Sequence, residues 1–194
     1  MILVYMGRQV EQFYQDFLDK AGWDLKIKVP PCDRPVKKVS SLRSEERGVL
    51  FVPDGLTIGH LDKMFPQMLP KDSAPKIRKS ILDNWDEPVS GGWYDVEQQG
   101  ESPNRGATKS EARILFSSKG REQQSLPVYI LASKVNKEVN AHYLDEKSWT
   151  RLSNTWQNGD GLAVGFSAGG QLRITRLDPE QRHTNIGARS QGKT

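Results

Sequence analysis

The chain has 194 residues, with 28 lysines and arginines against 24 aspartates and glutamates, which gives a formal net charge of +4. This length suits one domain, and 36% hydrophobic residues supply enough apolar material for one core, so a wholly disordered chain is excluded. The longest apolar runs, at 2–6 and 127–132, fall far short of the ~20 residues that span a bilayer. The N-terminal run is also too short, and lacks the preceding basic stretch, for a signal peptide.

Cysteine and histidine are scarce and scattered. Cys32 is the only cysteine, so the chain can form no intrachain disulfide and no cysteine-rich metal site. His60, His142 and His183 lie far apart, so no helical pair of histidine ligands exists. We therefore expect a cytoplasmic protein with no membrane association, no bound metal and no cofactor, and the oligomeric state stays open.

The N-terminal half contains most of the helical patterns. Between residues 9 and 20, apolar side chains recur at helical spacing and form one stripe, which predicts an amphipathic helix packed on a core. In chain order, the patterns predict a short strand or apolar cap at 2–5, this helix at 9–20, a half-buried strand at 23–29, a proline-broken loop at 30–47, a buried strand at 48–53, and helices at 56–64 and 73–85.

The C-terminal half looks rich in strands. The patterns predict a strand at 93–96, a polar loop at 98–109, two strands at 112–117 and 128–133, a helical stretch within 145–154, and a hairpin from 162–166 and 171–177. Beyond Asp178 the chain is polar, and we expect a flexible surface tail over 178–194. The fold class is therefore α+β: a single domain over 1–177, with amphipathic helices in the N-terminal half, then a mainly antiparallel β-sheet, then the polar C-terminal tail.

Residues 165–169, Gly-Phe-Ser-Ala-Gly, match the pattern Gly-x-Ser-x-Gly. With its flanks, residues 162–170, this segment resembles the nucleophile elbow of the α/β-hydrolase family, in which the serine lies on a sharp turn from a strand to a helix. The resemblance implies that Ser167 is a nucleophile and that the backbone N–H of Ala168 helps to stabilise an oxyanion.

The residues after the motif favour a different interpretation. Residues 171–177 alternate between polar and apolar, which is typical of a strand, whereas the elbow requires a helix. Only Asp178, Glu180 and His183 follow Ser167 as a possible acid and base, and they leave no room for the strands that carry these groups in the family. The pattern therefore favours a hairpin with a glycine-containing turn over a serine hydrolase.

Positive charge is concentrated in two segments. Residues 20–47 hold eight basic and four acidic side chains, an excess of +4 that equals the net charge of the whole chain. A second basic segment, 71–79, lies around the start of the helix expected at 73–85. Together the segments supply the candidate binding residues Arg34, Lys37, Lys38, Arg43, Lys76, Arg78 and Lys79. Lysine and arginine clusters of this kind bind phosphate groups, although they also occur as ordinary solvated surface.

These patterns favour an interaction protein over an enzyme. We expect a cytoplasmic chain that binds a protein or a nucleic acid through basic surfaces at 26–47 and 71–79, with a serine hydrolase acting through Ser167 as the alternative. The sequence does not distinguish between the two kinds of partner.

Overall fold

The computed structural model describes residues 8–23, 28–32, 47–69 and 75–193. Most of the residues expected as a strand at 2–5, a strand at 23–29 and a loop at 30–47 lie outside this part of the chain. The helices are α1 (Arg8–Lys20), α2 (Ile58–Met64), α3 (Pro75–Trp85), α4 (Lys109–Ser117) and α5 (Leu126–Asn140). The strands are β1 (Arg47–Val52), β2 (Gly92–Glu97), β3 (Glu122–Gln123), β4 (Trp149–Thr155), β5 (Gly161–Phe166), β6 (Leu172–Leu177), β7 (Ile186–Ala188) and β8 (Ser190–Lys193).

The strands form two four-stranded sheets. The first has the order β1-β2-β8-β3 and is antiparallel throughout. The second has the order β6-β5-β4-β7, and only its β4–β7 pair is parallel. Five helices and two mainly antiparallel sheets within the described residues confirm the predicted α+β class.

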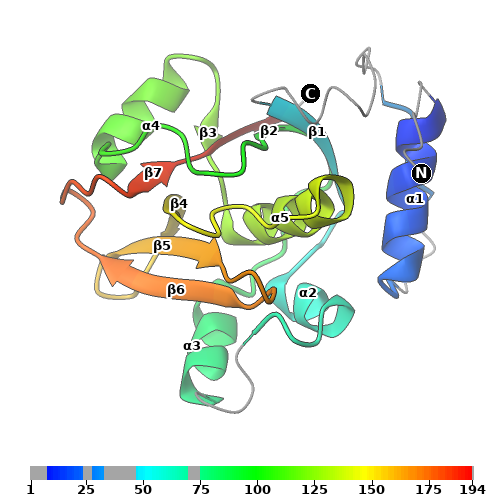
Figure 1. The fold of residues 1–194 in the computed structure, drawn as a ribbon, viewed down its shortest axis with the longest axis horizontal. Coiled ribbons are helices and arrows are strands. Elements are labelled where there is room, and N and C mark those ends of the chain that lie inside the picture. Colours follow the sequence, from blue (N-terminus) through cyan, green and yellow to red (C-terminus); the bar gives the residue numbers. More distant parts are fainter. Residues whose placement is uncertain (1–7, 24–27, 33–46, 70–74, 194) are drawn as a thin grey trace.

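Helix α5 lies in the middle of the molecule, while α1 and α4 lie toward opposite ends of its long axis (Figure 1). It contacts β1, β4 and α2, and its side chains from Leu126 to Ser133 are all buried. The first two turns of α5 are almost wholly apolar and buried on every side, which suits such a central position. None of the described helices, α5 included, is long and apolar enough to cross a membrane.

The chain crosses between the sheets at Arg189, the one residue between β7 and β8. Its side chain is fully buried, and its Nε donates to Oδ2 of Asp145 over 2.9 Å. The Asp145 carboxylate also accepts hydrogen bonds from the hydroxyls of Tyr129, at 3.2 Å, and Ser148, at 2.8 Å. Burial and the adjacent Asp145 carboxylate raise the pKa of Tyr129, so this hydroxyl stays protonated as a donor. This network joins α5, the start of β4 and both sheets.

Several predicted elements are present. Helix α1 matches the stripe expected at 9–20, and α2 and α3 match the next two helices. Strands β1 and β2 match the predictions at 48–53 and 93–96, and β5 and β6 pair as the expected hairpin. The N-cap expected at Ser73 lies outside the described residues.

The two strands predicted at 112–117 and 128–133 are wrong, because both segments are helical. Helix α4 begins after Thr108, whose Oγ1 accepts from the N–H of Glu111 while the Glu111 carboxylate accepts from the N–H of Thr108. This Thr-Lys-Ser-Glu capping box indicates the start of a helix, but the apolar residues that follow it suggested a strand. Helix α5 follows Ser125 and has Pro127 in its first turn, also a helix-start signal.

Two expectations near the C-terminus also differ from the structure. Residues 149–155, expected to be helical, form β4, where Leu152 is buried in the core between sheet neighbours. Part of the expected tail forms β7 and β8, and β8 lies inside the first sheet, between β2 and β3. The tail was misjudged because it has few apolar residues, and the hydrogen-bond partners of its buried polar groups lie up to about ninety residues away in sequence.

Candidate functional site: a polar pocket at the start of helix α5

The predicted basic residues do not form one described patch. Arg34, Lys37, Lys38 and Arg43 lie outside the described residues, as does the side chain of Lys76. The other two are paired with acids: Nε of Arg78 donates to Oδ2 of Asp62 over 3.1 Å, and Nζ of Lys79 donates to Asp83 over 2.6 Å. These pairings leave less positive charge on α3 available for a partner.

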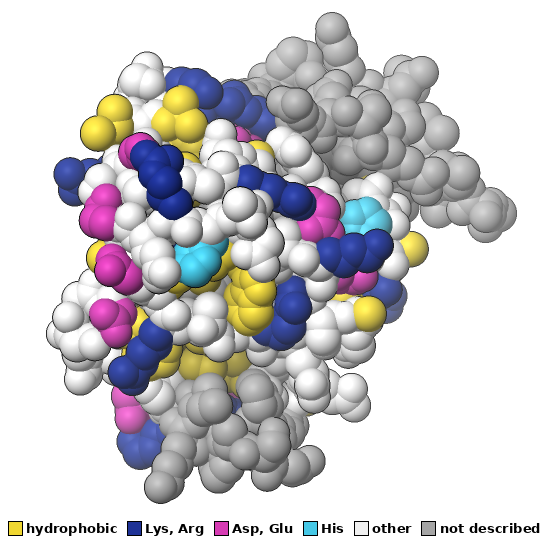
Figure 2. All heavy atoms as spheres, turned by 60° about the vertical axis from the view of Figure 1, so that its left-hand side comes forward, with side chains coloured by type: hydrophobic (Ala, Val, Ile, Leu, Met, Phe, Trp, Pro, Cys, Tyr) yellow, Lys and Arg dark blue, Asp and Glu magenta, His cyan; other side chains and the backbone are white. Residues whose placement is uncertain are grey.

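One face of the described surface also shows mixed charges. Basic and acidic side chains are interspersed over the face that turns forward in Figure 2. A phosphate-binding surface requires lysines and arginines gathered together, and this face does not provide such a group.

Ser167 lies in the turn between β5 and β6. Its N–H donates to the carbonyl of Gln171 over 2.9 Å, and its Oγ accepts from the N–H of Gln171 over 3.1 Å. The chain then continues into β6, whereas the resemblance to α/β-hydrolases requires a helix there. The strand-to-helix elbow is therefore replaced by a hairpin.

Gly165 of the motif and Gly170, which follows it, have structural roles in this hairpin. Gly170 has φ +84°, and a Cβ there would lie 2.5 Å from the hydroxyl oxygen of Tyr143. A Cβ at Gly165 would lie 2.8 Å from the carbonyl oxygen of Asp145. Close packing and backbone conformation thus explain these glycines without catalysis.

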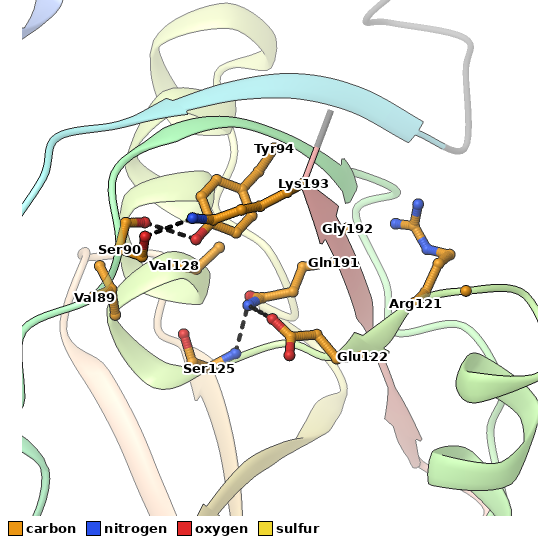
Figure 3. Close-up of a pocket in the computed structure, with 11 residues that line it drawn as sticks. Val89, Ser90, Tyr94, Arg121, Glu122, Ser125, Val128, Gln191, Gly192 and Lys193 are labelled. Carbon is orange, nitrogen blue, oxygen red and sulfur yellow. Dashed lines mark hydrogen bonds between the residues drawn. The ribbon is translucent and has the colours of Figure 1, made fainter.

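A pocket of about 650 Å³ opens between β2, β8 and the start of α5 (Figure 3). It is lined by Val89, Ser90, Tyr94, Gly120, Arg121, Glu122, Ser125, Val128, Gln191, Gly192 and Lys193. Tyr94 pairs with Lys193 in the β2–β8 ladder, which holds these two side chains as neighbours. The pocket therefore depends on β8, the strand formed by the expected tail.

One part of the pocket wall is organised around Ser90. The hydroxyl of Tyr94 donates to the carbonyl of Ser90 over 2.7 Å, and the ammonium of Lys193 donates to Ser90 Oγ. Burial, assisted by the carboxylates of Glu122 and Asp54, raises the pKa of Tyr94, so its hydroxyl stays protonated as a donor. The Lys193 ammonium also lies 5.8 Å from the centre of the Tyr94 ring, and these contacts fix its position.

Another part of the wall is organised around the Gln191 amide. Its Nε2 donates to Oε1 of Glu122 over 2.7 Å, and its Oε1 accepts from the N–H of Ser125 over 3.1 Å. Ser125 is the N-cap residue of α5, but its hydroxyl makes no capping bond. Its Oγ is buried, with no hydrogen-bond partner in the described part of the chain. This wall therefore presents the Glu122 carboxylate, held by the Gln191 amide.

Arg121 lines the pocket, but its guanidinium forms hydrogen bonds with residues of β2 and β8. Its Nε donates to Ser190 Oγ over 2.7 Å, and its guanidinium donates to the carbonyl of Asp95 over 2.9 Å. Figure 3 shows its guanidinium pointing away from Gln191 and Ser125. Arg121 therefore supports β8 rather than the pocket interior.

Lys134 forms a separate cluster on α5. Its Nζ lies 5.1, 4.9 and 5.2 Å from the ring centres of Phe65, Tyr143 and Phe166, and it donates to the carbonyl of Gly170 over 3.2 Å. Burial lowers the pKa of Lys134 to about 8. These contacts tie α5 to the β5–β6 hairpin and to the residue after α2.

Of the predicted site residues that the structure describes, Arg78, Lys79 and Ser167 do not line the pocket. Only one part of this pocket could have been predicted from the sequence. The N-cap residue and the proline within 125–127 indicate the start of α5. The pairing of residues 94–96 with 191–193 spans about a hundred residues and leaves no local pattern.

Comparisons with models of protein families, with curated proteins and with solved structures found no match for this chain.

Proposed function

We propose that this chain is a binding protein that holds a small polar molecule in the pocket formed by β2, β8 and the start of α5. The observation that carries the proposal is the pocket itself. Its volume of about 650 Å³ is in the range of small-molecule sites, ~300–1,000 Å³. The partly exposed Val89 side chain lies there beside a few polar groups, Ser90, Glu122 and Lys193 among them.

The polar groups are held in place before any ligand arrives. Ser90 fixes Lys193, and Gln191 fixes Glu122, so little side-chain entropy remains to be lost on binding.

We propose binding rather than catalysis because two acid–base groups of the lining, Glu122 and Lys193, are exposed, whereas catalytic groups are usually enclosed. None of the described lining residues is histidine or cysteine. Ser90 and Lys193 are hydrogen-bonded, but the exposed position of Lys193 does not favour it as the base of a nucleophilic serine.

A ligand screen with a blocked variant tests this proposal. Saturation-transfer NMR with a library of small polar metabolites should detect binding to the wild type, and Val89→Trp should abolish it by filling the pocket. Val139→Trp is the matched control, because Val139 is also a partly buried valine packed against the core. Binding that survives Val89→Trp, or a wild type that binds nothing in the library, contradicts the proposal.

A second candidate function is contact with an acidic partner, nucleic acid or protein, through the basic segments. It is supported by the charge of residues 20–47, whose +4 equals that of the whole chain. We propose nucleic acid as the first partner to test and place both functions in the cytoplasm, since a chain with a single cysteine can form no intrachain disulfide.

Salt-dependent binding to single-stranded DNA tests this second candidate. Replacing Arg34, Lys37, Lys38 and Arg43 with serine should lower the slope of log affinity against log salt by about 0.7 for each phosphate that these side chains neutralise in the wild type. The matched control replaces four exposed basic residues elsewhere, Lys63, Arg113, Lys119 and Lys147. If the slope decreases equally in both variants, the basic residues attract DNA only nonspecifically.

A further inference from the structure

The pocket presents two opposite charges that do not neutralise each other. The Lys193 ammonium belongs to β8 and the Glu122 carboxylate to β3, and neither forms an ion pair with any described residue. In Figure 3, Lys193 with Ser90 and Glu122 with Ser125 line different parts of the pocket. A ligand between them therefore meets a cation on one side and an anion on the other.

Each charged group is fixed by one protein contact and keeps further bonding capacity. Lys193 donates one hydrogen bond to Ser90, and an ammonium has three donors. Glu122 accepts from Gln191 at Oε1, which leaves its second oxygen for another donor.

The rest of the lining offers little apolar contact surface. Val128 is fully buried and Tyr94 is nearly so, which leaves Val89 as the partly exposed apolar side chain. A molecule that satisfies the two charged features carries an anionic end and a cationic end.

Building on the proposed function, we infer that the ligand is a zwitterionic amino compound, an α-amino acid or short peptide. Its carboxylate pairs with Lys193 and its ammonium pairs with Glu122. A purely anionic ligand would be repelled by Glu122, and a purely cationic one by Lys193, so the pocket selects for both charges together.

The test compares three forms of one probe by calorimetry at low salt: the dipeptide leucyl-leucine, its N-acetyl derivative, which lacks the cation, and its C-terminal amide, which lacks the anion. The free dipeptide should bind the wild type at least tenfold more tightly than either derivative. Glu122→Gln should weaken the dipeptide at least tenfold but bind the anionic N-acetyl form more tightly than the wild type does, because the repelling carboxylate is gone. Lys193→Met should weaken the dipeptide similarly but bind the cationic amide more tightly, because the repelling ammonium is gone.

Two exposed substitutions, Glu87→Gln and Lys147→Met, serve as matched controls and should change none of these affinities. Equal binding of the three probe forms overturns the zwitterion inference. The zwitterion inference is also overturned if the wild type binds none of the three probes but binds a library molecule, and Val89→Trp abolishes that binding. In that case the proposed function of the pocket stands. If no molecule binds in a manner sensitive to Val89→Trp, the proposed function fails as well.

Discussion

At the scale of single residues, the buried pair of Arg189 and Asp145 has the largest expected effect on stability. Both side chains are fully buried, and the Arg189 guanidinium also donates to the carbonyls of Glu97 and Gln99. Removing one partner of such a pair leaves an uncompensated buried charge, which costs about 3–5 kcal/mol. Arg189→Met should therefore lower the free energy of unfolding by this amount in urea denaturation.

The exposed pair of Lys79 and Asp83 is the control for that measurement, since an exposed ion pair contributes about 0–1 kcal/mol. Lys79→Met should change the free energy of unfolding by less than about 1 kcal/mol. Similar decreases in Arg189→Met and Lys79→Met would contradict the role assigned to the buried network.

Two adjacent glycines in the β5–β6 turn allow a matched comparison. Gly170→Ala places a Cβ where φ is +84° and where the Tyr143 hydroxyl lies 2.5 Å away, so it should destabilise the protein by about 1–3 kcal/mol. At Gly169 the nearest atom to a Cβ is 3.8 Å away, so Gly169→Ala should be close to neutral. Thermal unfolding of the two variants measures the difference.

The same turn gives a chemical prediction for Ser167. A fluorophosphonate probe should leave the wild type unlabelled, because the serine lies in a hairpin and its Oγ accepts a backbone hydrogen bond from Gln171. Labelling that disappears in Ser167→Ala would restore the hydrolase interpretation.

At the scale of elements, helix α4 depends on its capping box. The backbone N–H of Thr108, donating to Glu111, and the nearby Arg182 guanidinium hold the pKa of Glu111 below its usual 4.5. A carboxyl group with a lowered folded-state pKa stabilises the fold above its unfolded pKa, and this contribution is lost as pH falls through the folded value. Stability should therefore decrease below about pH 4.5 partly through this group.

Urea denaturation across pH 3–7 tests the capping box. Thr108→Ala should cost about 1 kcal/mol at neutral pH. Glu111→Gln should be less stable than the wild type at pH 7, and this difference should shrink toward pH 3. Glu87→Gln is the control for an exposed glutamate outside any cap. A constant difference for Glu111→Gln over this range would show that the cap does not lower the pKa of its carboxyl group.

The elements that the sequence predicted correctly share one property: their evidence is local. Helix α1 has a clear apolar stripe, and the β5–β6 hairpin has alternation on both sides of a glycine turn. Helices α4 and α5 were mistaken for strands because short apolar runs are ambiguous, and their caps at Thr108 and Ser125 were given too little weight.

At the scale of the whole molecule, the C-terminal residues complete both sheets. Strand β8 lies between β2 and β3, and Arg189 provides the buried cation for Asp145. A chain that ends at residue 185 should therefore fail to give a dispersed NMR spectrum or a cooperative thermal transition. A cooperative transition near that of the full chain would mean that these residues are dispensable for folding.

The pocket itself could not be predicted from sequence, because its walls come from residues about a hundred positions apart. Lys193 and Glu122 belong to strands separated by most of the C-terminal half, and only pairing with β8 brings them to one site. The basic segments could be identified from the sequence, because counting charged residues requires no structure. Such a count does not show which lysines already form ion pairs, as Lys79 does with Asp83.

The most direct test of the pocket function is a chemical-shift map of the binding site. In ¹H–¹⁵N NMR spectra, titration with the tightest ligand from the metabolite screen should move the backbone signals of Tyr94, Ser125, Val128, Gln191 and Lys193 first and furthest. The same titration of Val89→Trp should leave these signals unmoved. Shifts confined to residues away from the pocket, or an unchanged response in Val89→Trp, would contradict the assignment of this pocket as the binding site.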